Sequence, residues 1–254
     1  MSQYGDLYSK YYDLLYSDKD YVIEAKYVED LIKKNTNNAM SILELGCGTG
    51  KHADIFCDSG FIVHGVDDSK QMLNIAELKR VGKENNLFFT HSKIQNLNLD
   101  KKFDVVTSLF HVMSYQITNE SLVESFRVAK NHLKKRGIFI FDFWYGPAVL
   151  TDLPSTRVKR LKSDEIKVTR IAEPKLHPQL NVVDVNYDIY IQDLISEKIT
   201  QQKELHRMRY FFDAELTEFI LKVGFKIKQK YKWMDFQKPD LNSWSVVWVL
   251  ENSK

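Results

Sequence analysis

The chain has 254 residues, and 44% of them are hydrophobic, which is enough for one large domain or a domain with an insertion. Its formal net charge is only +2, so the total indicates neither a strongly basic nucleic-acid binder nor an acidic disordered chain. The two cysteines, Cys47 and Cys57, lack metal-ligand spacing, which argues against a disulfide scaffold and a zinc site and predicts a cytoplasmic protein. No apolar run approaches the roughly 18 residues of a membrane span, so we expect no membrane segment.

The first part of the chain alternates between helix and strand patterns. Apolar residues between 21 and 34 fall on one helical face. After this helix we expect strands at 42–45, 61–67, 86–90, 103–110 and 137–143, and helices at 51–59, 69–79 and 119–133. Short, continuously apolar strands separated by helices predict βαβ units and a parallel sheet covered on both faces.

The pattern changes between residues 155 and 212. Three strand-like runs, at 166–173, 181–193 and 198–211, alternate apolar and polar residues, which predicts an antiparallel insertion with one wet face. A helix is expected from an Asp213 N-cap to Val223, ending at Gly224. Two last strands, 225–233 and 244–250, predict an antiparallel hairpin at the sheet edge.

Three glycines at alternate positions end the first predicted strand. In ILELGCGTG, Gly46, Gly48 and Gly50 follow the strand residue Glu44. Such a turn lets the backbone approach a ligand, and the helix N-terminus beyond it offers free N–H groups. The spacing is GxGxG and not the GxGxxG of dinucleotide folds, which speaks against an oxidoreductase. Asp67 ends the second strand, where a carboxylate can accept both hydroxyls of a ribose.

On these motifs, ILELGCGTG and FIVHGVDDSKQML, the chain resembles the class I S-adenosylmethionine-dependent methyltransferases. The resemblance implies an α/β, Rossmann-like methyltransferase fold: a mostly parallel seven-stranded sheet with an antiparallel last strand, plus a small antiparallel β insertion over the active site. Residues 1–150 and 211–254 would form the S-adenosylmethionine-binding domain. Residues 151–210 would form the insertion, a substrate lid.

The resemblance also implies a set of cofactor-binding residues. Many family members carry a Gly-Asp pair after the third strand, but Ser92 and Lys93 stand here. We therefore expect the aliphatic stem of Lys93 and the backbone at Ile94 to lie along the adenine. Met72 is the residue for which a core position explains the sequence equally well. The full set is Tyr12, Glu44, Gly46, Cys47, Gly48, Gly50, Asp67, Asp68, Met72, Lys93, Ile94 and Leu109.

Four further motifs resemble the nucleotide-linked amino-sugar N-methyltransferases: YYDLLYSDKDYVIEA, FDVVTSLFHVMSY, FDFWYGP and HRMRYFF. The resemblance implies that the N-terminal tyrosines close over the cofactor, which gives Tyr12 and Tyr16 cofactor-side roles, and Tyr16 is a candidate catalytic residue. His111 is the other candidate catalytic residue because of its position after the fourth strand, whose carboxyl end is where an open α/β sheet binds ligands. A histidine hydrogen-bonded to local backbone explains His111 equally well, and the tyrosines also fit the apolar face of a helix. The resemblance implies substrate-side roles for His206, Arg209 and Tyr210. Tyr115, Trp144 and Tyr145 are candidate substrate-binding residues because they follow the fourth and fifth strands, and packing is the alternative role of the strand-end aromatic residues Trp144 and Tyr145.

The sequence thus predicts an S-adenosylmethionine-dependent methyltransferase that acts on a small molecule and uses no metal. The favoured acceptor is the amino group of a nucleotide-linked sugar. The alternative acceptor is a hydroxyl, carboxyl or phosphate-derived group of another small metabolite or glycan precursor, and the alternative class is a nucleotide-binding protein without turnover. The basic run 157–162 either attracts a nucleotide diphosphate or is solvated surface. The low net charge argues against a nucleic-acid partner, and a homodimer is compatible with the sequence.

Overall fold

The computed structural model of the chain describes residues 14–15 and 19–253. Its helices are α2 (Tyr21–Asn35), α3 (Lys51–Asp58), α4 (Lys70–Leu78), α5 (Asn119–Asn131), α6 (Gly146–Thr151) and α7 (Asp213–Val223), with 3-10 turns η1 (Ile94–Asn96), η2 (Val112–Tyr115) and η3 (Pro178–Leu180). Its strands are β1 (Ser41–Leu45), β2 (Ile62–Asp67), β3 (Leu87–His91), β4 (Phe103–Ser108), β5 (Leu133–Tyr145), β6 (Arg157–Lys162), β7 (Ile166–His177), β8 (Val182–Asp193), β9 (Ile199–Phe211), β10 (Phe225–Lys232) and β11 (Ser245–Asn252).

Seven of these strands form a central sheet in the order β3-β2-β1-β4-β5-β11-β10. Strands β1 to β5 pair in parallel, and β11 runs antiparallel to both β5 and β10. The Rossmann-like, mostly parallel sheet with an antiparallel last strand, expected from the sequence, is confirmed. In such sheets a ligand binds outside the carboxyl ends of the strands.

Apolar side chains from helices cover the central sheet on both faces. On one face, α2 and α3 pack against the sheet through residues such as Val28 and Phe56, both fully buried. On the other face, α5 and α7 pack through Phe126 and Ile220 against a row of phenylalanines from β5. These two apolar layers fix the sheet as a rigid platform for the loops at its carboxyl edge. Within the described residues, no helix is long and apolar enough to cross a membrane.

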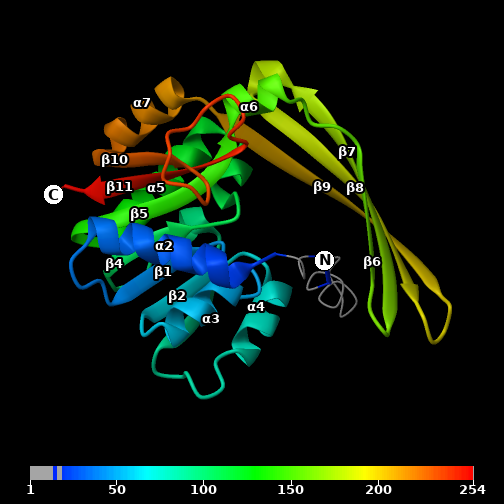
Figure 1. Cartoon of the computed structure of the whole chain (residues 1–254). Coiled ribbons are helices and arrows are strands. Elements are labelled where there is room, and N and C mark those ends of the chain that lie inside the picture. Colours follow the sequence, from blue (N-terminus) through cyan, green and yellow to red (C-terminus); the bar gives the residue numbers. More distant parts are fainter. Residues whose placement is uncertain (1–13, 16–18, 254) are drawn as a thin grey trace.

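The insertion is a long antiparallel sheet of β6 to β9 that stands beside the helix-covered sheet (Figure 1). A short parallel pairing joins it to the central sheet, Trp144 to Tyr210 and Tyr145 to Phe211. Strand β6 is the basic run 157–162, which the sequence interpretation treated only as a charged stretch. Its Lys and Arg residues lie on an edge strand, where charged side chains keep the open edge from pairing with other chains.

The start of α7 differs from the sequence prediction. The N-cap of the helix is Phe212, and Asp213 is its first residue, so the expected Asp213 cap is wrong. The Asp213 carboxylate instead lies 2.9 Å from the ammonium of Lys230 on β10 and adds negative charge to the first helical turn.

Candidate active site

A cavity of about 400 Å³ lies between the carboxyl edge of the central sheet and the inner face of the insertion. Most of the residues that the sequence singled out line it. From the cofactor set these are Glu44, Gly46, Cys47, Gly48, Asp67, Asp68, Met72 and Leu109, and from the catalytic and substrate sets they are His111, Tyr115, Trp144 and His206. Residues more than a hundred positions apart in the chain therefore meet in one cavity.

Several predicted site residues do not line this cavity. Lys93 is exposed at the start of η1, and Ile94 is buried in the apolar layer around α5, so neither side chain lies in the cavity. The side chain of Tyr145 packs against the same layer. Tyr12 and Tyr16 lie outside the described residues.

Arg209 was expected to bind substrate, but the structure uses it elsewhere. Its side chain is 4% exposed, and it pairs with Glu215 at the start of α7 and donates to Asn119 Oδ1 at 2.8 Å. Tyr210, on the neighbouring position, is fully buried in an apolar cluster of β8 and β9. Both residues fix the base of β9 against the central sheet and do not line the cavity.

The glycine turn is held in a left-handed backbone conformation. Gly46, Gly48 and Gly50 have φ of +77°, +55° and +71°, a region that disfavours other residues. A Cβ on Gly46 would lie 2.6 Å from Val112, and a Cβ on Gly50 would lie 2.9 Å from the Phe89 ring. Gly50 therefore makes room for packing under the turn, whereas Gly46 and Gly48 line the cavity.

Asp67 fixes the position of this turn from the end of β2. Its Oδ2 accepts the backbone N–H of Gly48 at 2.8 Å, and its Oδ1 accepts the N–H of Ser69 at 2.9 Å. Burial raises the pKa of Asp67, and these backbone donors oppose that rise. The carboxylate keeps lone-pair capacity for a ligand hydroxyl, because an ionised carboxylate accepts about four hydrogen bonds.

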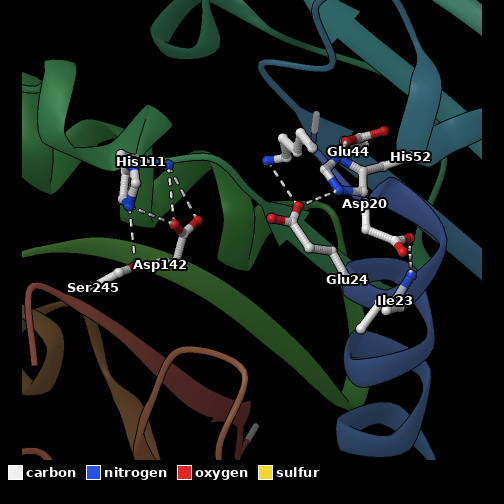
Figure 2. A network of polar contacts seen from close by, with 9 residues as sticks. Asp20, Ile23, Glu24, Glu44, His52, His111, Asp142 and Ser245 are labelled. Atoms are coloured by element: carbon white, nitrogen blue, oxygen red, sulfur yellow. Dashed lines mark hydrogen bonds and ion pairs between the residues drawn. The ribbon is translucent and has the colours of Figure 1, made fainter. Parts of the chain in front are cut away.

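Glu44 ends a chain of polar contacts that reaches the N-terminal part of the fold (Figure 2). Lys19 pairs with Glu24 at 2.7 Å, Glu24 lies 3.0 Å from Nε2 of His52, and Nδ1 of His52 lies 3.8 Å from Glu44. Glu44 is 2% exposed, and its Oε2 has no hydrogen-bond partner among the described residues. Burial, followed by the nearby charge of Asp67, raises the pKa of Glu44 to about 8. A buried carboxylate with one unpartnered oxygen beside a glycine turn is suited to receive a cationic group.

We expect binding of S-adenosylhomocysteine to tighten between pH 6 and pH 8 because of Glu44. Below pH 8 the carboxyl is mostly protonated in the free protein, and a ligand ammonium favours its ionised form, so binding releases a proton. Ionisation of Glu44 should strengthen binding by up to about tenfold for each unit that the pH rises, which is about 1.4 kcal/mol. Calorimetry at pH 7 in two buffers of different ionisation enthalpy measures the released proton.

The matched variant is Glu44→Gln, which keeps the shape of the side chain and cannot ionise. It should release fewer protons than the unmodified protein and lose this part of the pH dependence. An identical proton release in both proteins would show that Glu44 does not contact the ammonium.

His111 and Asp142 form a second polar group on the opposite side of the view in Figure 2. Phe110 and His111, directly after β4, both have positive φ, +65° and +62°, so the chain turns sharply into η2. The Asp142 carboxylate accepts the His111 backbone N–H at 3.1 and 3.2 Å and lies 3.2 Å from ring Nε2. Ser245 Oγ on β11 lies 3.0 Å from the same nitrogen. Asp142 thus holds both the strained backbone and the ring.

This arrangement favours a neutral imidazole with a defined tautomer. Burial lowers the pKa of His111, and the charge of Asp142 opposes the shift. Because a carboxylate only accepts hydrogen bonds, Nε2 carries the proton and Nδ1 remains an acceptor. His111 can therefore accept a hydrogen bond from a substrate N–H or O–H.

The wall of the cavity opposite the glycine turn comes from the insertion, and the sequence interpretation missed most of it. It consists of Arg170 from β7, Val185, Tyr187 and Ile189 from β8, and Glu204, His206 and Met208 from β9. The alternation in β8 and β9 was the available signal, since residues two apart on a strand share a face. Which face turns toward the glycine loop depends on the register between strands, which the alternation does not define.

The fold and the cavity together define a class of protein. A buried acidic residue before a left-handed glycine turn, and a second carboxylate that ends the next strand, fit the amino and ribose groups of S-adenosylmethionine. The glycine turn has the spacing GxGxG and lacks the GxGxxG spacing that binding of a dinucleotide requires. The chain is similar in its fold and its site to the S-adenosylmethionine-dependent methyltransferases.

Comparison with known proteins agrees with this class. Residues 42–137 match the family model of a methyltransferase domain. A curated relative, dTDP-3-amino-3,4,6-trideoxy-alpha-D-glucopyranose N,N-dimethyltransferase of Streptomyces venezuelae, is 25% identical over 221 residues, which are 85% of this chain and 89% of the relative. The match is therefore longer than the methyltransferase domain alone and reaches into the insertion.

Solved structures show the same fold along nearly the whole chain. An S-adenosylmethionine-dependent methyltransferase from Clostridium acetobutylicum has a TM-score of 0.82 and 23% identity, covering 96% of this chain and 97% of its own. An amino pentose methyltransferase from Micromonospora echinaspora, bound to S-adenosylmethionine, has a TM-score of 0.76 and 19% identity, with 99% of each chain covered. The expected fold, enzyme class and methyl donor are confirmed.

Proposed function

We propose that this methyltransferase transfers a methyl group from S-adenosylmethionine to the amino group of a nucleotide-linked sugar. The observation that carries the proposal is the single cavity that runs from the glycine turn to the polar inner face of the insertion. It places a donor site and a small-molecule acceptor site within one volume. The 25% identity to an amino-sugar dimethyltransferase, over 85% of this chain, supports this acceptor.

The donor site uses the residues that the glycine turn and β2 bring together. S-adenosylmethionine supplies an electrophilic methyl group on a sulfonium when it is bound. Glu44 would take its ammonium, the backbone at Gly46 and Gly48 would approach the amino-acid part, and Asp67 would accept the ribose hydroxyls. Met72, which lines the cavity and is 9% exposed, would cover the nucleoside base.

The acceptor site lies between the two walls. His111 would orient the amine by accepting one N–H, so that its lone pair points at the methyl group. Trp144 lines the cavity beside His111, with ring centroids 6.2 Å apart, and would pack against the sugar. Arg170 lies over the Tyr187 ring at 4.7 Å and supplies a cation on the insertion side for a diphosphate. Positioning of this kind supplies much of the rate of a bimolecular transfer.

The test is methyl transfer to a panel of dTDP-linked sugars. We expect label from methyl-labelled S-adenosylmethionine in 3-amino or 4-amino deoxysugar nucleotides, with mass spectrometry placing it on nitrogen. The matched hydroxyl sugars, identical except at the amine, should stay unlabelled. Label on the hydroxyl sugars alone would replace the amine with the alternative acceptor, and label on no sugar would overturn the proposal.

Other expectations from the sequence stay predictions. They are the cytoplasmic location, the homodimer, the action of residues 151–210 as a substrate lid and the absence of a nucleic-acid partner. The roles of Tyr12 as a cofactor residue and of Tyr16 as a catalytic residue also stay predictions.

A further inference from the structure

A hydrogen-bonded chain of three side chains joins the insertion to the central domain across the cavity. Tyr115 lies in η2, four residues after His111, and its hydroxyl is 2.7 Å from Nδ1 of His206 on β9. Nε2 of the same histidine is 2.9 Å from the carboxylate of Glu204, two residues earlier on β9. All three residues line the cavity.

The carboxylate sets the direction of the hydrogen bonds. An ionised Glu204 can only accept, so Nε2 of a neutral His206 carries the proton, and Nδ1 is left as an acceptor. The Tyr115 hydroxyl therefore donates to Nδ1, and a phenolic oxygen that donates its proton can in addition accept an N–H. The order of donors is Tyr115 to His206 to Glu204, a path along which a proton can leave the cavity.

Neighbouring side chains keep the imidazole in this position. The Tyr187 ring on β8 meets the His206 ring edge-on, with centroids 5.0 Å apart, and Val185 pairs with His206 across the strands. Among the residues that the structure describes, the titratable or charged groups in contact with His206 are Glu204, Tyr115 and Tyr187, with Arg170 from β7 over the Tyr187 ring. His206 keeps a quarter of its side chain exposed, which connects the path to water.

An amine acceptor needs such a path, and this requirement rests on the proposed function. An aliphatic amine is protonated at neutral pH, by analogy with the lysine pKa of about 10.4, and the ammonium has no lone pair to attack a methyl group. His111 on the other wall is less suited to keep that proton, because its burial lowers its pKa. His111 would therefore orient the acceptor amine, and other residues of the cavity would remove its proton.

We propose that Tyr115, His206 and Glu204 form a proton relay that deprotonates the bound acceptor ammonium. One N–H proton of the ammonium passes to the Tyr115 oxygen while the Tyr115 hydroxyl proton passes to Nδ1 of His206. The products are the neutral amine with its lone pair, an unchanged tyrosine and an imidazolium beside the Glu204 carboxylate. The imidazolium then releases its proton to water, so charge and atoms balance before each methyl transfer. Tyr115 contacts the amine, and His206 and Glu204 act through it.

The pH profile of kcat/KM for a dTDP-amino sugar tests the relay. In Tyr115→Phe and His206→Gln we expect a loss of at least tenfold at pH 7 that shrinks below threefold at pH 9.5, where the neutral fraction of the amine in solution is roughly 300 times larger than at pH 7. General bases typically contribute about a hundred- to ten-thousand-fold, so the pH 7 loss is well within reach. Glu204→Gln should behave in the same way. Loss by the same factor at every pH would indicate a structural role and overturn the relay.

The matched control is His177→Gln. His177 also pairs with a carboxylate of the insertion, Asp184 at 3.0 Å, but does not line the cavity. We expect its pH profile to equal that of the unmodified protein. Thermal melting checks that each variant folds, and Tyr115→Phe, which removes one oxygen, is the readout if His206→Gln unfolds.

A second readout does not depend on activity. In ¹⁵N NMR of the free protein, assigned with His206→Gln, the neutral His206 ring should show protonated Nε2 and unprotonated Nδ1. The opposite tautomer would contradict the relay, because Nδ1 could not then accept from Tyr115. Failure of the proposed function is distinguishable, since it would appear as absence of transfer to amines in the unmodified protein.

Discussion

Replacement of Asp67 with alanine is expected to weaken S-adenosylhomocysteine binding by about 10- to 100-fold. The carboxylate holds the backbone N–H groups of Gly48 and Ser69 and would also accept the ribose hydroxyls. Hydrogen bonds to a charged group contribute about 1.5–3 kcal/mol, and about 1.4 kcal/mol corresponds to tenfold. The effect is large because one substitution removes the ligand contact and frees the turn that carries the other contacts. Titration calorimetry at pH 7.5 measures it.

Two further variants test whether the loss of affinity comes from the Asp67 carboxylate itself. Asp67→Asn keeps one acceptor oxygen and should lose less affinity than Asp67→Ala. Asp58→Ala is the surface control, because Asp58 lies at the end of α3 and pairs with Lys83 outside the cavity. Its affinity should stay within twofold of the unmodified protein. An unchanged affinity in Asp67→Ala would show that the ribose is bound elsewhere.

The donor side of the site could be predicted from sequence because its determinants are local. Glu44, the glycine turn and Asp67 lie within 24 positions and on consecutive βα units, and parallel pairing of β1 and β2 brings the strand ends together. A strand that ends in an acid is visible in sequence, and its neighbour in the sheet follows from the right-handed βαβ connection. For the same reason the glycine positions correspond to residues with positive φ.

The acceptor side was harder because it depends on contacts between distant segments. Tyr115 and His206 are 91 residues apart, and only the register of β8 and β9 decides which side chains face the cavity. Strand β9 also shows that the alternation of side chains does not predict what each residue contacts. Arg209 was expected at the substrate, but Glu215 and Asn119 provide buried partners that sequence reasoning could not place beside it. Lys93 is exposed directly before η1, and the path of this turn could not be predicted from the sequence either.

His111→Ala is expected to lower kcat at least about tenfold while S-adenosylhomocysteine affinity stays within threefold. The imidazole lines the acceptor part of the cavity, and Asp142 and Ser245 hold Nε2, so the lost function is orientation of the acceptor amine by Nδ1. Misalignment of a reacting amine costs rate without costing donor affinity. Steady-state kinetics with a dTDP-amino sugar, together with calorimetry, measures both quantities. An unchanged kcat would make His111 a structural residue.

Asp142→Asn distinguishes the reason for this loss. The asparagine amide keeps the shape of the carboxylate but presents a donor or a weaker acceptor to Nε2, so the ring is no longer held in the tautomer with Nδ1 as acceptor. The plateau of kcat should therefore fall toward that of His111→Ala. The negative charge of Asp142 raises the pKa of His111, so removal of this charge lowers the pKa of His111 further. The neutral imidazole then persists to lower pH, and the acid limb of the plot of kcat against pH shifts to lower pH. Ser245→Ala leaves the carboxylate in place and should lower kcat by less than threefold. A fall of the plateau combined with a downward shift of the acid limb requires Asp142 to act through His111, since loss of the fold would lower the rate without moving the limb.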